Sequence, residues 1–195
     1  KQKKLYGYLA HSAETILEQP SLWHELEQLK KRGLVEKTGV SVYHPHEIDS
    51  LLKMGYVPDL IQLPLNLLDH RFVPSLAYYK SLGIEIHSRS AFLQGLFFVE
   101  KDKIFAYFNP IKHVIEHVQN KFANKNALGA ALLFHCLAVK EIDKVVIGVN
   151  DALQLQGLLM ELKTSKDLEL NLDGFDLEKI EDIEKMILPY NWPKN

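Results

Sequence analysis

The sequence predicts a parallel α/β fold, and three observations support that fold class. Short apolar runs alternate with helical patterns five times along the chain. Three successive predicted helices end at glycines, Gly33, Gly55 and Gly83, and each is followed by an apolar run. Polar residues follow the predicted strands. Strand-then-helix units in this order give a parallel sheet with right-handed crossovers.

Each element is predicted from hydrophobic periodicity and from start and stop signals. Strands are predicted at residues 5–10, 37–42, 59–63, 84–86 and 144–149. Helices are predicted at residues 21–32, 45–54, 74–82, 110–122, 127–139, 153–163 and 177–187. Ser21 is expected to cap the first helix, and Pro45 and Pro74 to open the next two. The interval 97–109 reads as an irregular loop, and 189–193 as a tail laid over a surface.

Composition sets limits on the class of protein. The chain has 195 residues, of which 47% are hydrophobic, which is enough for one compact domain. Its net charge of -2 gives no reason to expect nucleic acid or an anionic membrane as a partner. Cys136 is the single cysteine, and no apolar run is long enough to span a membrane, so we expect a cytoplasmic protein. The chain lacks an initiator Met, and we expect it to be part of something longer.

Polar side chains gather at the carboxyl ends of the predicted strands, where parallel α/β proteins bind their ligands. Gln62 is the most informative of them, because it stands between Ile61 and Leu63 in an otherwise apolar strand. The alternative is that polar residues simply begin loops. The residues just past the predicted strands are His11, Ser12, Ser41, Gln62, Asn66, Ser88, Arg89, Ser90, Gly148, Val149 and Asn150.

Five of these stretches together resemble the aldo/keto reductases in order and spacing. The stretches are Tyr8-Leu9-Ala10-His11, Lys37-Thr38-Gly39-Val40-Ser41, Asp59-Leu60-Ile61-Gln62-Leu63-Pro64-Leu65-Asn66, Ile86-His87-Ser88-Arg89-Ser90 with Leu93-Gln94-Gly95-Leu96, and Val145-Val146-Ile147-Gly148-Val149-Asn150. Each is weak alone, but the five span nearly the whole chain. The sequence around residues 83–96 is similar to that of bacterial members associated with surface polysaccharide or sugar metabolism.

The resemblance implies a (β/α)8 TIM barrel, of which residues 1–195 look like strands 4 to 8 with their helices outside. A complete barrel needs about 250 residues. Five strands alone leave open sheet edges, so we expect either the rest of the barrel in a longer chain or pairing of edges in a homo-oligomer.

The resemblance also implies an oxidoreductase that uses NADP(H) to reduce a small aldehyde, ketone or sugar carbonyl. The family uses a Tyr acid held by a Lys and an Asp, and a His that orients the carbonyl oxygen. Only the His carries over, onto His11. The other three belong to the absent strands, so we expect this chain alone to be inactive. The alternative is a non-catalytic nucleotide-binding or regulatory protein on the same scaffold.

Most of the cofactor-binding positions implied by the resemblance are present. Ser41 and Gln62 match the positions that hold the nicotinamide carboxamide, and His87 falls where the family stacks an aromatic ring. Ser88, Arg89, Ser90, Leu93 and Gly95 match the pyrophosphate loop, and Gly148, Val149, Asn150 and Gln154 would lie along the adenosine. Val42 replaces a frequent Asn, and Asn150 and Asp151 stand where an Arg or Lys often grips the 2′-phosphate. NAD is therefore possible in place of NADP.

Three other patterns have simpler interpretations. His113, Glu116 and His117 match an H-x-x-E-H zinc motif, but no third ligand is evident, and a solvated amphipathic helix explains them. His44 and His46 fit a loop and helix start. Cys136 lies in an apolar helix and reads as a buried, inert thiol. No metal site is predicted.

Overall fold

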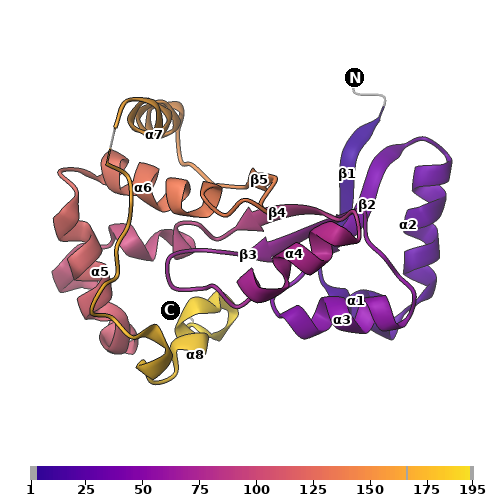
Figure 1. Cartoon of the computed structure of the whole chain (residues 1–195), viewed down its shortest axis with the longest axis horizontal. Helices are drawn as coiled ribbons and strands as arrows, with labels where there is room; N and C mark the ends of the chain where they lie inside the picture. Colours follow the sequence, from indigo (N-terminus) through magenta and orange to yellow (C-terminus); the bar gives the residue numbers. More distant parts are fainter. Residues whose placement is uncertain (1–3, 166, 194–195) are drawn as a thin grey trace. The chain divides into compact units, whose positions relative to one another are not determined.

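A computed structural model describes residues 4–165 and 167–193 (Figure 1). These residues form two compact units, each with its own set of contacts. The first unit runs up to Pro64 and also contains His70–Arg89 and Lys140–Lys144. The second contains Leu65–Asp69, Ser90–Val139 and the chain from Val145 onward.

The strands form one five-stranded sheet in the order β1-β2-β3-β4-β5, and the three strand pairs from β1 to β4 are parallel. The predicted parallel α/β class is confirmed. The strands are β1 Leu5–Ala10, β2 Val35–Ser41, β3 Leu60–Pro64, β4 Glu85–Arg89 and β5 Lys144–Val145. Sequence order equals spatial order, as expected of repeated strand-helix units.

Two strand predictions are wrong in their lengths. β4 does not stop at Ile86 but continues through the polar residues to Arg89, pairing with β3 as far as Pro64. β5 covers only Lys144 and Val145, because residues 146–149 are apolar yet lack the backbone pairing that defines a strand. An apolar sequence predicts burial, but pairing depends on a neighbouring strand.

The first unit covers its sheet with four helices (Figure 1). They are α1 Ala13–Glu18, α2 Ser21–Lys31, α3 Pro45–Lys53 and α4 Val73–Ser81. α1 was not predicted, and Ser12 caps it by accepting a 3.3 Å hydrogen bond from the Thr15 N–H. Ser21 is not the cap of α2, because Pro20 holds that position. Val40, Ile61 and Ile86 are fully buried in the core of this unit.

The second unit is mostly helical. Its elements are η1 Leu93–Phe98, η2 Lys101–Lys103, η3 Ala106–Phe108, α5 Asn109–Lys121, α6 Lys125–Leu137, α7 Ala152–Thr164, η4 Leu177–Lys179, α8 Ile183–Ile187 and η5 Pro189–Asn191. The predicted loop 97–109 contains short 3-10 turns. The predicted helix 177–187 is divided into η4 and α8 by Asp182, which has a left-handed φ of 56°.

The packing of α6 on α7 gives the second unit part of its core (Figure 1). Ala130, Ala131 and Leu133 of α6 cluster with Leu158 of α7 and with Leu168. Small residues on α6 allow a close approach, since a Cβ added at Gly129 would lie 3.0 Å from Leu158 Cδ1.

Candidate functional site

Three polar residues lie in one cross-strand row in the first unit. The Cα of Ser41 at the end of β2 pairs with that of Gln62 in β3, and Gln62 pairs with His87 in β4. In a parallel sheet, paired residues project from the same face. The register therefore brings together the three side chains that the family resemblance assigns to the nicotinamide.

Two members of this row have unsatisfied hydrogen-bonding capacity. Ser41 and Gln62 are half-buried, and within residues 4–165 and 167–193 neither side chain hydrogen-bonds to protein. Half-buried amides and hydroxyls without protein partners are suited to a ligand. The third member, His87, is 9% exposed and already has one ring nitrogen engaged, 2.6 Å from Glu85 Oε1.

Cationic side chains lie at the carboxyl ends of β2 and β4. The Arg89 guanidinium stacks 4.2 Å from the centre of the Tyr43 ring and donates a 3.0 Å hydrogen bond to the Val42 carbonyl. Arg71 Nη1 lies 3.2 Å from His44 Nδ1, which must accept because a guanidinium only donates. Guanidinium groups bind phosphate oxygens well, so the two at this end of the sheet suit a ligand that carries phosphate.

A second polar cluster lies nearer the amino ends of the strands and is centred on Glu85. Its carboxylate is 9% exposed and accepts hydrogen bonds from Tyr6, Lys37 and Lys144 as well as His87. Burial alone would raise the pKa of this carboxyl, but these hydrogen bonds outweigh burial and hold the pKa well below its usual range. The hydrogen bond to Glu85 in turn raises the pKa of the Lys37 ammonium.

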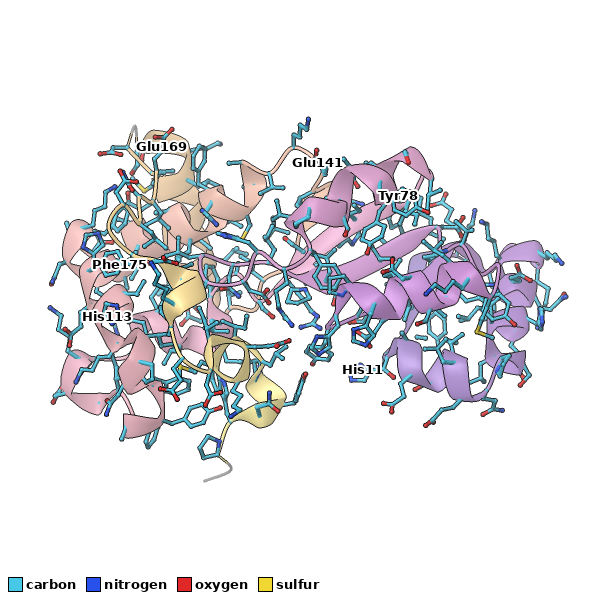
Figure 2. The ribbon with its side chains drawn as sticks, turned by 60° about the horizontal axis from the view of Figure 1, so that its bottom comes forward. His11, Tyr78, His113, Glu141, Glu169 and Phe175 are labelled. Atoms are coloured by element: carbon cyan, nitrogen blue, oxygen red, sulfur yellow. The ribbon has the colours of Figure 1, made fainter. Side chains whose placement is uncertain are left out.

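Two further predicted site residues of the first unit, His11 and Ser88, lie in different environments. His11 follows β1 directly, is exposed, and is labelled in Figure 2. Ser88 alternates with His87 along β4, and its hydroxyl is fully buried without a hydrogen-bond partner among the described residues.

The predicted pyrophosphate loop continues in the second unit as a tightly turned segment. Ser90, Leu93 and Gln94 have left-handed φ angles of 67°, 44° and 52°, followed by Gly95 at 84°. Such angles in residues other than glycine each cost of order 1–3 kcal/mol and concentrate in ligand-binding loops. The Leu93 side chain is fully buried, so only its backbone is available to a ligand.

The predicted adenosine residues form the start of α7. Asp151 caps this helix by accepting a 2.7 Å hydrogen bond from the Gln154 N–H, and Gln154 Oε1 accepts one of 2.7 Å from the Asn150 N–H. The preceding Gly148 and Val149 lie outside any strand.

The second unit contains an aromatic cavity of about 410 Å³. Phe108 and Trp192 meet edge-to-face there with their ring centres 4.9 Å apart. The Trp192 indole N–H donates a 2.8 Å hydrogen bond to the Met186 carbonyl, which fixes the ring. The lining residues are Gln94, Leu96, Val99, Phe105, Ala106, Tyr107, Phe108, Trp192 and Pro193. This size suits a small organic molecule.

The rival motifs have structural explanations. His113 and His117 pack against Phe175, with ring centres 5.4 and 4.9 Å away, and Figure 2 shows His113 next to Phe175. Among the described residues, no three His, Cys, Asp or Glu side chains could hold a metal together. Cys136 is fully buried, as predicted, and burial raises the pKa of its thiol to about 12, which disfavours the reactive thiolate.

Sequence reasoning missed Glu85 and its cation partners. Glu85 was read as part of the apolar run 84–86, although a Glu in a buried strand with a His two positions later is itself a signal of paired charges. It also missed Arg71 and Tyr43, whose roles depend on contacts with residues distant in sequence.

Sequence comparison decides the family. A sequence model of the aldo/keto reductase family matches residues 3–182. The chain belongs to this family. Aldo/keto reductases as a family act on small-molecule carbonyl compounds with a nicotinamide cofactor. No curated protein matches the sequence.

Solved aldo/keto reductases share the fold. AKR11C1 from Bacillus halodurans, in its holo form, has a TM-score of 0.67 at 18% identity, over 95% of this chain and 62% of the other. The glycerol dehydrogenase AKR11B4 from Gluconobacter oxydans has a TM-score of 0.62 at 16% identity, over 99% of this chain and 62% of the other. The chain thus spans about three fifths of their length, and its five parallel strands correspond to part of the aldo/keto reductase barrel.

One further finding concerns membranes. Within the part of the chain that the structure describes, no helix combines the length and apolar character needed to cross a bilayer.

Proposed function

We propose that this chain carries the cofactor-binding part of an NADP(H)-dependent aldo/keto reductase that reduces an aldehyde, ketone or sugar carbonyl. The observation that carries the proposal is the row of Ser41, Gln62 and His87, in which two half-buried polar side chains have no protein partner among the described residues. A bound nicotinamide would supply the hydride.

The residues of this chain have distinct parts in the proposal. Ser41 and Gln62 would hydrogen-bond the carboxamide and orient the ring, while Arg71 and Arg89 would neutralise phosphate charge. His11, next to the end of β1, would orient the carbonyl oxygen in the complete barrel. The Tyr, Lys and Asp of the family fall outside the matched stretches, so turnover would require the longer protein. Pairing between copies and a cytoplasmic location stay predictions.

Binding of NADPH by this chain tests the proposal. In a titration followed by NADPH fluorescence, Gln62→Ala is expected to raise the Kd about tenfold, the effect of one lost hydrogen bond of roughly 1.4 kcal/mol. Gln28→Ala, on the exposed face of α2, is the matched control and should bind as the wild type does. A wild-type chain that binds no NADPH would contradict the proposal.

Repeating the titration with NADH shows which of NADPH and NADH the chain binds more tightly. Asp151 stands at the start of α7, where its negative charge would repel a 2′-phosphate. If the longer protein binds NADPH but reduces no carbonyl compound, that result would support the non-catalytic alternative.

We also propose that the aromatic cavity of the second unit binds a small organic molecule. Trp192, Phe105 and Phe108 offer broad apolar ring faces, and Gln94 adds an amide. This lining suits a carbonyl compound with an aliphatic or sugar ring, because ring C–H groups pack well on aromatic faces.

A tryptophan-based titration tests the cavity. The chain has two tryptophans, so in a Trp23→Phe background the emission reports on Trp192 alone. Cyclohexanol, an alcohol product analogue, should shift that emission saturably, and Phe105→Ala should weaken its binding about threefold or more through lost apolar contact. Phe134→Ala, on α6 outside the cavity lining, is the control. An emission that cyclohexanol leaves unchanged would exclude binding there.

A further inference from the structure

Glu85 is the most heavily hydrogen-bonded buried carboxylate in the first unit, and the proposed function does not use it. Its Oε2 accepts from the Tyr6 hydroxyl at 2.5 Å and pairs with the Lys37 ammonium. Its Oε1 lies 3.1 Å from Lys144 Nζ and 2.6 Å from His87 Nε2. Four different elements thus converge on one side chain.

These partners keep Glu85 in its ionised form. Lys37 and Lys144 bring two positive charges to the carboxylate, and the Tyr6 hydroxyl can only donate to it in this geometry. The ammonium of Lys144 also lies 3.9 Å from the centre of the Tyr6 ring, so the cations and the tyrosine hold one another in place. A neutral carboxylic acid would lose both ion pairs.

An ionised Glu85 determines which nitrogen of His87 carries the proton. A carboxylate accepts hydrogen bonds and cannot donate, so the contact of 2.6 Å requires a proton on His87 Nε2. In the neutral imidazole, Nδ1 is then the acceptor. The His87 side chain is 11% exposed, so it has little freedom to turn away.

The register links this pair to the candidate cofactor site. Glu85 and His87 are two residues apart on β4 and project from the same face, and His87 pairs across the sheet with Gln62. The fixed tautomer therefore lies in the row whose other two members have no partner in the part of the chain that the structure describes. An acceptor there suits an N–H donor on the ligand, such as a carboxamide amino group.

We propose that Glu85 is a positioning residue of the cofactor site: it fixes His87 in the Nε2–H tautomer so that Nδ1 is an acceptor for an amide N–H of the ligand. This inference rests on the proposed function. It assigns a role to a buried ion cluster that a purely structural interpretation would treat as packing.

Nitrogen-15 NMR of the histidine side chains in the whole chain tests the tautomer directly. The chain has nine histidines, and His87→Gln identifies the His87 signals by their loss. The wild type is expected to show His87 in the Nε2–H form at pH 8. Glu85→Gln should convert it to a mixture, because a glutamine amide can either donate or accept. Lys144→Met removes another partner of Glu85 but leaves the carboxylate, so it should keep the wild-type tautomer.

The NADPH titration supplies the second readout. Glu85→Gln should raise the Kd about tenfold, as the loss of one well-placed hydrogen bond does, and Lys144→Met should change it by less than about twofold. A wild-type His87 in the Nδ1–H form would overturn the inference without any variant. A Glu85→Gln protein whose His87 tautomer and Kd for NADPH both equal those of the wild type would also overturn it.

The two proposals fail differently. If wild-type protein binds NADPH and Gln62→Ala weakens it while Glu85→Gln does not, only the role of Glu85 is lost. If wild-type protein binds no NADPH, the proposed function and this inference both fall.

Discussion

Replacing Gly39 with alanine is expected to remove a large part of the free energy that stabilises the fold. A Cβ at this position of β2 would lie 1.6 Å from the Leu60 carbonyl oxygen and 2.7 Å from the Leu60 carbonyl carbon. Both are backbone atoms of the neighbouring strand β3, so no side chain can move aside. The strands must separate where Gly39 pairs with Leu60.

The cost should be about 4 kcal/mol or more, the exceptional end of single substitutions, against a total stability of roughly 5–15 kcal/mol. Urea unfolding followed by circular dichroism measures it. Gly148→Ala is the matched control, because an added Cβ there would have no atom of the other described residues within 4 Å, its chain neighbours aside, and its effect should stay within about 0.5 kcal/mol. A Gly39→Ala protein with the wild-type midpoint would show that β2 and β3 do not pair as described.

Acid is expected to destabilise the protein through Glu85. The folded-state pKa of this carboxyl lies well below its ordinary value of 4.5, so the folded state favours the ionised form more than the unfolded state does. The stabilisation is therefore fully present above about pH 5 and is lost as the pH falls below 4.5. About 2 kcal/mol should be lost by pH 3, a modest value because Lys37 and Lys144 are partly exposed and screened.

Urea midpoints at pH 7, 5, 4 and 3 measure this loss. Glu85→Gln should be less stable than the wild type at pH 7 and should lose less stability between pH 5 and 3. A residual slope is expected from Asp59 and Asp143: burial would raise the pKa of each, but hydrogen bonds from Lys30 and Thr38, and from Lys80 and Ile86 respectively, lower it. Equal losses in variant and wild type would remove Glu85 as the cause.

Local sequence signals determined most of the elements. Gly33, Gly55 and Gly83 were predicted to end three helices, and each has a left-handed φ between 72° and 79° directly after a helix. A glycine stop depends only on the backbone freedom of that residue, so it can be read from the chain itself. The alternation of apolar runs with helical patterns likewise gave the parallel sheet, because burial on two faces leaves a continuous apolar run.

The predicted nicotinamide residues came from resemblance, and the register then brought Ser41, Gln62 and His87 into one row. The length of β5 could not be predicted, since residues 146–149 are apolar but unpaired. Only the tertiary structure decided the Glu85 cluster. Tyr6 and Glu85 are 79 positions apart, and Lys144 and Glu85 are 59 apart. What a carboxylate does depends on the charges that strand pairing brings within hydrogen-bonding distance, and no local pattern contains that information.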